Sequence, residues 1–260
     1  MRRLRLLSAN FAALAFIMAR SAIAADLPLK APVPFTERFS WTSCHLGGHI
    51  GGGFGKKDIT DPVQLAQDSF LGAGFTTGIT TISPEPTGIV IGGQIGCDYQ
   101  FASSSFVIGI EGAGSGSTMR GSRTAVLPLG NPSIALVQAN TDFLPSLTAR
   151  LGYAFDNVLL YVKGGVALAG DKFEVIGSFA ATPFDFRGLD NRLGWSVGAG
   201  GEWAFSRHWS AFIEYDYYQF GHGNILMSDG INGFSGLLDV RQNVQVVKGG
   251  FNFHVWGAGL

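Results

Sequence analysis

The chain has 260 residues, of which 38 are glycine, and 14% carry a charge, against about 25% in a typical soluble domain. This much glycine excludes a coiled coil or a long helical bundle, and a hydrophobic content of 46% excludes a disordered chain. The net charge of -1 gives no indication of a nucleic-acid partner.

The first 24 residues predict a cleaved export signal. Arg2, Arg3 and Arg5 flank the start of a mostly apolar run from Leu4 to Met18, and Ala22-Ile23-Ala24 fits the small-residue cleavage pattern. The run is shorter than the roughly 20 residues of a spanning helix, and no later segment offers such a helix. We therefore expect an exported chain that is either soluble or a membrane β-barrel.

Residues 25–40 contain three prolines and predict an extended linker on the periplasmic side. From Trp41 onward the residue pattern changes. Apolar residues alternate with small or polar ones, which is the period of β-strands. We treat residues 41–260 as one domain. The alternating segments are 41–54, 88–101, 106–119, 139–154, 158–170, 190–205, 209–223 and 240–256.

The connections between these segments are short and long in turn. The short ones are 102–105, 155–157 and 206–208, and the long ones are 55–87, 120–138, 171–189 and 224–239. In an up-and-down barrel this order places every short turn at one end, as in outer-membrane barrels. We predict an all-β fold, an eight-stranded antiparallel up-and-down transmembrane β-barrel. Ten strands would form if 55–87 contains a hairpin.

The two faces of each segment indicate which side meets lipid. In 190–205 one face carries Leu193, Trp195 and Val197, whereas the other carries Arg192 and Glu202 among glycine and serine. A soluble, lipocalin-like barrel alternates too, but its solvated face would carry more Lys and Glu. Small residues with single charges suit a crowded interior. We therefore predict that the apolar face is outside, and a soluble carrier is the weaker alternative.

Nine charged residues are predicted to point into the lumen. Side chains fill the interior of an eight-stranded barrel, so these charges should pair across it. The network is either an ion path or a salt-bridge plug, and the narrow lumen favours the plug. Its predicted members are Asp98, Glu111, Arg150, Lys163, Arg192, Glu202, Glu214, Asp216 and Lys248.

Aromatic residues gather beside the short turns, which predicts an interfacial girdle at that end of the barrel. Its predicted members are Trp41, Phe101, Phe106, Tyr153, Trp203, Trp209, Phe253 and Trp256.

Cys44 and Cys97 are the only cysteines. The alternation places both on the same face of adjacent antiparallel strands, near the short turns. A cross-strand disulfide is one interpretation, because the export route is oxidising. Two free thiols at the lipid surface are the other.

Motifs that suggest catalysis or metal binding are weak here. Gly194-Trp195-Ser196-Val197-Gly198 has the spacing of a hydrolase nucleophile elbow, but that motif needs a strand-turn-helix context and this segment alternates as a strand. His45 and His49 share a strand face roughly 13 Å apart, too far to hold one ion. We expect no catalytic residues, no metal and no cofactor.

Several segments resemble the small outer-membrane β-barrel family that includes the opacity proteins and the OmpA membrane domain, often labelled porins. They are Asp26-Leu27-Pro28, Trp41-Thr42 followed by His45-Leu46-Gly47-Gly48-His49-Ile50-Gly51, Gly92-Gly93-Gln94-Ile95-Gly96 with Tyr99-Gln100-Phe101, and Ala149-Arg150-Leu151-Gly152-Tyr153-Ala154. The resemblance covers nearly the whole mature chain. It implies a barrel in a Gram-negative outer membrane, with roles as a surface antigen or in envelope integrity.

We therefore expect a non-enzymatic outer-membrane protein with a structural or surface-interaction role. A small diffusion channel is the alternative, and a lipid-modifying enzyme is a weaker one that would require a Ser, a His and an acid to meet near one rim. Expected partners are outer-membrane lipids, lipopolysaccharide and, during biogenesis, the barrel-assembly machinery. No nucleic acid is expected, and the long loops contain no recognition motif that identifies a partner.

Overall fold

The computed structural model describes residues 39–60, 81–127, 133–179 and 182–255. The predicted signal peptide, most of the linker and Trp256 lie outside these residues. The strands are β1 (Ser43–Thr60), β2 (Thr81–Ile82), β3 (Thr87–Gln100), β4 (Phe106–Leu127), β5 (Ser133–Phe155), β6 (Val158–Phe179), β7 (Thr182–Ala204), β8 (Trp209–Asp229) and β9 (Ser235–His254). The described residues contain no helix long and apolar enough to cross a membrane.

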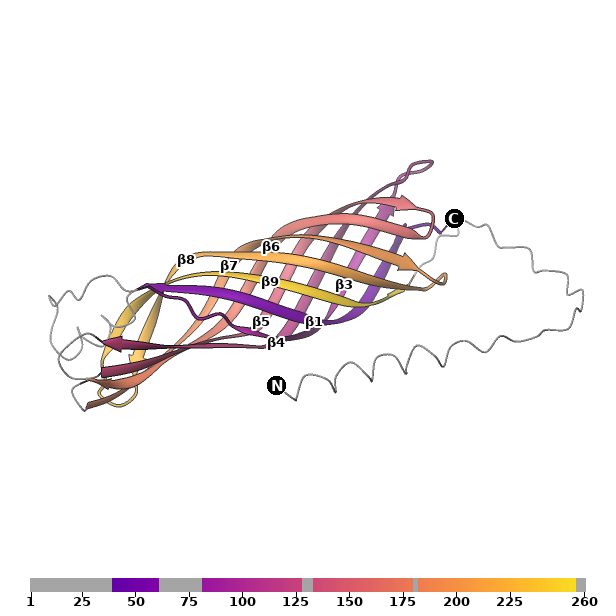
Figure 1. Ribbon diagram of the computed structural model, residues 1–260. Helices are drawn as coiled ribbons and strands as arrows, with labels where there is room; N and C mark the ends of the chain where they lie inside the picture. Colours follow the sequence, from indigo (N-terminus) through magenta and orange to yellow (C-terminus); the bar gives the residue numbers. More distant parts are fainter. Residues whose placement is uncertain (1–38, 61–80, 128–132, 180–181, 256–260) are drawn as a thin grey trace, which may run out of the picture. The chain divides into compact units, whose positions relative to one another are not determined.

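The sheet closes on itself. Each long strand pairs antiparallel with the next along the chain, and β1 also pairs with β9, from His45 opposite His254 to Thr60 opposite Asp239. Figure 1 shows the long strands winding obliquely around a common axis. β2 has two residues and pairs only with the outer end of β1, so it adds no strand to the ring. The prediction of an eight-stranded barrel is confirmed, and the ring does not have ten strands.

Tight turns join the strands at one end of the barrel. Ser103 and Asp156 adopt positive φ angles of 59° and 53° in two of these turns. Polar residues tolerate this left-handed conformation better than bulky ones do. The register places these turns together, because Ser43 at the start of β1 is opposite Asp98, two residues before the end of β3, and the later strands pair in the same way beside their turns. The short turns all lie at the end where β1 begins, as the chain order predicts.

The strands are longer than predicted, because much of each expected loop is strand. β4 runs to Leu127, β6 runs to Phe179, and only residues 230–234 separate β8 from β9. β6 shows the reason. Leu160 and Leu168 point outward, but further along the same strand Phe173 and Val175 are buried inside while Lys172 is exposed. The alternation continues with its polarity reversed, so the outer extension of the barrel has the pattern of a water-soluble barrel. This outer extension comprises residues 55–60, 119–127, 133–142, 171–179, 182–191, 221–229 and 235–243.

Crowding in the lumen explains many of the inward glycines. A Cβ atom on Gly47 would lie 2.0 Å from Asn252 Oδ1, and one on Gly51 would lie 2.1 Å from the Val247 carbonyl oxygen. Real Cβ atoms do not approach other atoms this closely. The barrel is therefore too narrow for any side chain at these positions, as expected for eight strands.

Candidate functional site

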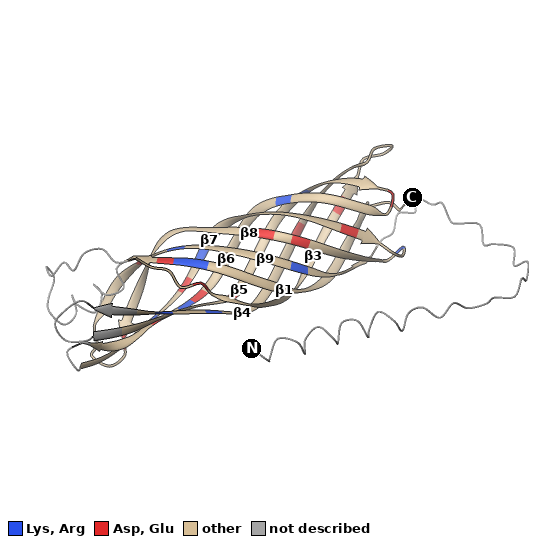
Figure 2. Ribbon diagram, viewed as in Figure 1, with Lys and Arg blue, Asp and Glu red and all other residues tan. Residues whose placement is uncertain are grey.

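The predicted lumen residues all lie inside the barrel. Each of the nine charged residues is at most 6% exposed to solvent. Figure 2 shows the charged residues as isolated bands on strands that are otherwise uncharged over most of their length. The alternation therefore placed each of the predicted lumen residues on the correct face, although it could not define their pairing.

Arg150 on β5 joins two carboxylates from different strands. Its guanidinium donates to Asp98 on β3 at 3.2 Å and to Glu202 on β7 at 3.0 Å. The guanidinium also lies over the ring of Tyr161, 4.0 Å from the centroid. Two charge-assisted hydrogen bonds and a stacked ring hold this arginine in one position.

Two lysines continue the network away from the short turns. Lys163 Nζ donates to Glu111 at 2.9 Å and to Glu214 at 2.6 Å. Lys248 Nζ lies 2.9 Å from Glu214 and 3.0 Å from Asp216. With Arg150 and its partners, these residues form a continuous central network that ties strands β3 to β9 together across the lumen.

Arg192 is separate from this network, which corrects the prediction that all nine charges join. Its guanidinium lies 2.7 Å from Asp190 and donates to the backbone carbonyl oxygens of Gly221 and Val240. Arg192 lies two residues beyond Gly194, where the register between β7 and β8 shifts. A register shift cannot be inferred from alternation, so the separation of Arg192 is not predictable from the sequence pattern.

Trp41 does not belong to the lipid-facing girdle, and that prediction is wrong. The side chain is fully buried, its Nε1 donates to the Asp156 carbonyl oxygen at 3.4 Å, and its ring contacts Phe39 and His254 edge-on. Trp41 has the same parity as Ser43 and His45, which point inward, so it enters the lumen. It packs in an apolar layer at the short-turn end with Val107, Ala154, Leu159, Tyr161 and Ala204.

A serine, a histidine and an acid do meet near this end. Ser43 Oγ lies 2.8 Å from His254 Nδ1, and His254 Nε2 lies 2.9 Å from Ser210 Oγ and 3.5 Å from Glu202. All four side chains are buried, and Glu202 also accepts hydrogen bonds from Ser210 and Asn252. The group is part of the hydrogen-bonded interior, with Trp41 packed against His254.

Beyond the central network the lumen contains two apolar layers. The nearer layer consists of Val90, Met119, Leu144, Ala167, Ala169, Tyr218, Phe220, Val244 and Val246. The outer layer consists of Ile59, Ile82, Ala135, Val137, Ala139, Phe173, Val175, Phe184, Phe186, Ile225, Met227, Leu238 and Val240. The polar side chains therefore do not form a continuous path along the described barrel.

One ion pair within the outer extension was not predicted. Lys57 Nζ donates to Asp171 at 2.7 Å and lies over the Phe173 ring, 4.6 Å from its centroid. Both side chains are fully buried. The alternation could have indicated this pair, because Lys57 has the inward parity of His49 on β1. The predicted strand ends at residue 54, however, so Lys57 falls in a predicted loop.

The other described girdle residues face outward. Their exposed fractions are 43% for Phe101, 54% for Phe106, 42% for Tyr153, 53% for Trp203, 46% for Trp209 and 39% for Phe253. A second aromatic contact, Trp195 with Tyr217 at 5.8 Å between ring centroids, lies eight residues further along β7 and β8 than Trp203 and Trp209. Eight tilted strand residues span about 20 Å, close to the height of a lipid-facing band.

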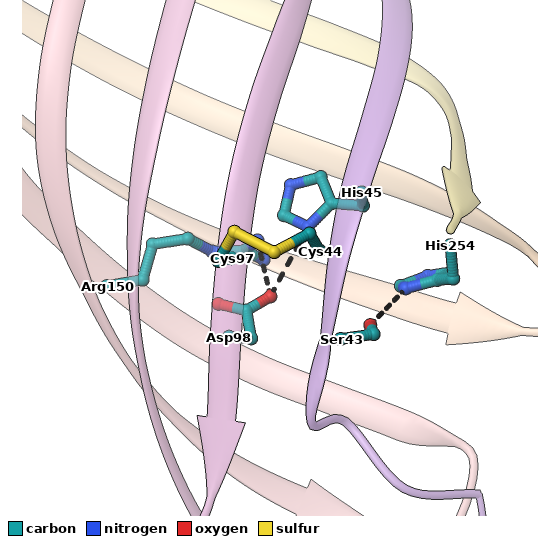
Figure 3. The surroundings of a disulfide bond; sticks show 7 residues. All are labelled: Ser43, Cys44, His45, Cys97, Asp98, Arg150 and His254. Atoms are coloured by element: carbon teal, nitrogen blue, oxygen red, sulfur yellow. Dashed lines mark hydrogen bonds and ion pairs between the residues drawn. A yellow bond between two sulfur atoms is a disulfide. The ribbon is translucent and has the colours of Figure 1, made fainter. Parts of the chain in front are cut away.

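The two cysteines are bonded to each other. Cys44 on β1 lies directly opposite Cys97 on β3, with Cα atoms 3.9 Å apart, and both side chains face outward. Figure 3 shows the bond beside His45 and Asp98, whose side chains point to the opposite face of the sheet. The disulfide therefore lies on the lipid-facing side of the first strand pair.

The weak motifs remain structural. Ser196 lies within β7 and points inward, 2% exposed, which is not the setting of a nucleophile elbow. His45 lies 3.6 Å from Asp98 and 3.7 Å from Glu111, and His49 bonds Ser115. Among the described residues, no group of His, Cys, Asp and Glu has the arrangement of a metal site.

Comparison with protein families gives one match over most of the chain. The model of the outer membrane protein beta-barrel domain matches residues 37–260. The chain is 29% identical to the 31 kDa outer-membrane immunogenic protein of Brucella melitensis, over 95% of this chain and 98% of that protein. It is 25% identical to the 25 kDa outer-membrane immunogenic protein of Brucella abortus, over 82% and 81%.

Two solved structures align with most of the chain. The outer membrane protease OmpT of Escherichia coli is 10% identical with a TM-score of 0.47, over 83% of this chain and 98% of that one. Ail, the attachment invasion locus protein of Yersinia pestis, is 15% identical with a TM-score of 0.35, over 81% and 99%.

Proposed function

The chain belongs to the family of outer membrane protein β-barrel domains, and we propose that this member is a closed barrel that acts through its outer surface. It is an outer-membrane protein of a Gram-negative bacterium. Its role is structural or surface-interacting within the envelope. This role requires a stable barrel and an exposed outer extension, and it requires no passage through the lumen.

The layered filling of the lumen carries this proposal. Trp41 and its neighbours fill the short-turn end, and the central network fills the next level. Beyond it lie the two apolar layers, together with Arg192 and the buried pair of Lys57 and Asp171. An ion crossing the barrel would leave the charged level and enter apolar surroundings, where it loses its hydration without gaining partners. This barrier favours the closed barrel over the diffusion channel.

Single-channel recording tests the proposal. Refolded protein in a planar bilayer should give no steady conductance, and Arg150→Ala with Lys163→Ala should not create one, because the apolar layers remain. Folding is verified by the shift in gel mobility on heating. Steady conductance that changes with those substitutions would identify the central network as an ion path and overturn the closed barrel.

We also propose that the protein has no enzymatic activity. Ser43 and Ser115 each lie 2.8 Å from a histidine nitrogen, and they are only 7% and 4% exposed. A hydrolase needs a nucleophile that substrate can reach. Incubation with an activated phosphonate reagent, which labels reactive serines, should leave Ser43 and Ser196 unmodified. Labelling of Ser43 that is lost in His254→Ala would contradict this.

The outer extension supports the surface role. Leu226 and Leu237 face each other across β8 and β9 and are 64% and 66% exposed, and Leu189 on β7 is 77% exposed. Apolar side chains exposed together on a water-facing surface are typical of contact sites. The relatives are named immunogenic outer-membrane proteins, which fits a surface that other molecules can reach.

A further inference from the structure

A polar cluster lies on the outward surface of β8, β9 and β1, where the apolar band ends. Gln245 on β9 is directly opposite Phe54 on β1 and, on its other side, Tyr217 on β8. Phe54 and Tyr217 are the outermost outward aromatic residues described on their strands. Gln245 therefore lies at the level where aromatic residues mark the boundary between lipid and water.

Two tyrosines fix the orientation of neighbouring amides. Tyr215 Oη donates to Gln245 Oε1 at 3.0 Å, and Tyr217 Oη donates to Gln219 Oε1 at 2.7 Å. The amide nitrogen of Gln219 is already directed at the backbone carbonyl oxygens of Phe220 and Gln242. Gln245 is exposed and its oxygen accepts from Tyr215, whereas its NH₂ group donates to no residue in the described part of the chain.

Two cations lie just above these amides. Lys56 is directly opposite Asn243, and Arg241 is directly opposite Asp58, one step further outward. Lys56 Nζ lies 3.3 Å from Asp58, the only carboxylate that the described residues place within 4.0 Å of either cation. The cluster therefore has a net positive charge.

Most other outward cations of the outer extension are paired more closely. Lys172 lies 2.7 Å from Asp142, and Arg187 lies 2.9 Å from both Glu174 and Asp185. Arg241 has no such partner among the described residues, so its guanidinium is available to an external anion. Arg120 on β4 is also exposed without a described ion pair, but it faces Asn140 and Thr87 rather than a row of amides.

We propose that Lys56, Arg241, Asn243 and Gln245 bind the phosphorylated sugar headgroup of an outer-leaflet glycolipid, the chemistry of the lipid A part of lipopolysaccharide. The two cations bind phosphate oxygens, and the two amides bind sugar hydroxyls. Acyl chains then lie along the apolar face below, beside Phe54 and Val247. This assignment rests on the outer-membrane location of the proposed function, and it names one partner of that outer surface.

The test measures binding of a defined bisphosphorylated lipid A to the refolded full chain in neutral detergent micelles. Lys56→Gln and Arg241→Gln should each weaken binding about fivefold, and together about 30-fold, because each interfacial cation contributes about one such factor. Gln245→Leu should weaken it about fivefold through the lost hydrogen bond. Arg120→Gln is the matched control and should leave binding unchanged.

Phosphatidylglycerol in the same micelles tests whether the site recognises a phosphorylated sugar or binds any anionic lipid. It should bind at least tenfold more weakly than lipid A, and Gln245→Leu should not affect it. Equal binding of both lipids, or equal losses in Arg120→Gln and Arg241→Gln, would overturn the proposal. The heat-dependent gel shift verifies that each variant is folded. Conductance is recorded separately, so a conducting barrel that binds lipid A would overturn only the closed barrel.

Discussion

At the scale of single residues, Lys57 shows how much depends on pairing inside the barrel. It lies among apolar side chains of the outer extension, and its partner Asp171 also accepts hydrogen bonds from the Thr141 hydroxyl at 2.7 Å and the Gln242 amide at 3.3 Å. A buried pair of this kind adds little net stability compared with apolar residues. Either charge alone, however, would be costly to bury.

We predict that Lys57→Met lowers the free energy of unfolding by about 3–5 kcal/mol, because it leaves the Asp171 carboxylate buried without a cation. Adding Asp171→Asn should restore most of this loss, because asparagine keeps an oxygen for Thr141 and Gln242 without the charge. Urea unfolding in lipid vesicles, followed by tryptophan fluorescence, measures both variants. The exposed neighbour Lys172→Met is the control and should change stability by less than about 0.5 kcal/mol. Additive losses in the double variant would show that the pair is not coupled.

Asp229 organises the turn between β8 and β9 at the outer end. Its Oδ1 accepts the backbone N–H groups of Asp185 and Ile231, and its Oδ2 accepts the Asn232 amide at 2.7 Å. Burial on its own would raise the pKa of Asp229, but these hydrogen bonds to the charged form outweigh it and lower the pKa below its usual value.

We predict that this turn is pH-dependent in one direction. A lowered folded-state pKa means that the carboxylate stabilises the turn above the ordinary Asp pKa of about 3.9, and this contribution is lost as the pH falls through the folded value. In NMR spectra the Ile231 amide signal should therefore titrate with a midpoint below about 3.9. Asp229→Asn should abolish the titration. A midpoint above the ordinary value would contradict the hydrogen-bonding argument.

At the scale of strands, the sequence predicts which face of the sheet a residue occupies more securely than it predicts where a strand ends. All nine lumen charges were assigned to the correct side, because a period of two fixes the face of every residue once one is known. Alternation also predicts the position of Trp41 better than its aromatic character does, because Trp41 shares the inward parity of Ser43. The alternation does not predict where the strands end, because Phe173 and Val175 reverse the polarity of β6 and such a reversal resembles the start of a loop. The separation of Arg192 depends on a register shift, which no alternation pattern encodes.

The disulfide between Cys44 and Cys97 fixes the register of β1 against β3. It closes a segment with a sequence separation of 53, which includes most of β1, the connection to β3 and most of β3. In the chain-entropy model, a loop of this length stabilises the folded state by roughly 4 kcal/mol. We predict that Cys44→Ala with Cys97→Ala lowers the free energy of unfolding in vesicles by up to that amount. Wild-type protein with the bond reduced is the control and should match the variant. Identical urea midpoints with and without the bond would contradict the prediction.

At the scale of the whole molecule, the barrel changes character along its axis. In its lipid-facing part the outside is apolar and the lumen holds the central charged network. In the outer extension the inside is mostly apolar, and the outside carries charges such as Lys172 and Glu174. A band of lipid with water above it explains this reversal of polarity, because an outer surface in lipid must be apolar and an outer surface in water can be charged. The reversal in the strands that reach the outer extension therefore marks the outer boundary of the membrane.

This polarity predicts the orientation of the barrel in the cell. The two native cysteines are bonded, so a newly introduced cysteine is the reactive thiol of the described chain. On intact cells a membrane-impermeant maleimide should label Ser228→Cys, which is exposed on the outer extension, and should label Ala102→Cys in a short turn only after the outer membrane is permeabilised. The unsubstituted protein is the control and should stay unlabelled in both conditions. Labelling of Ala102→Cys alone on intact cells would place the short turns outside, and the outer extension could then have no role at the cell surface.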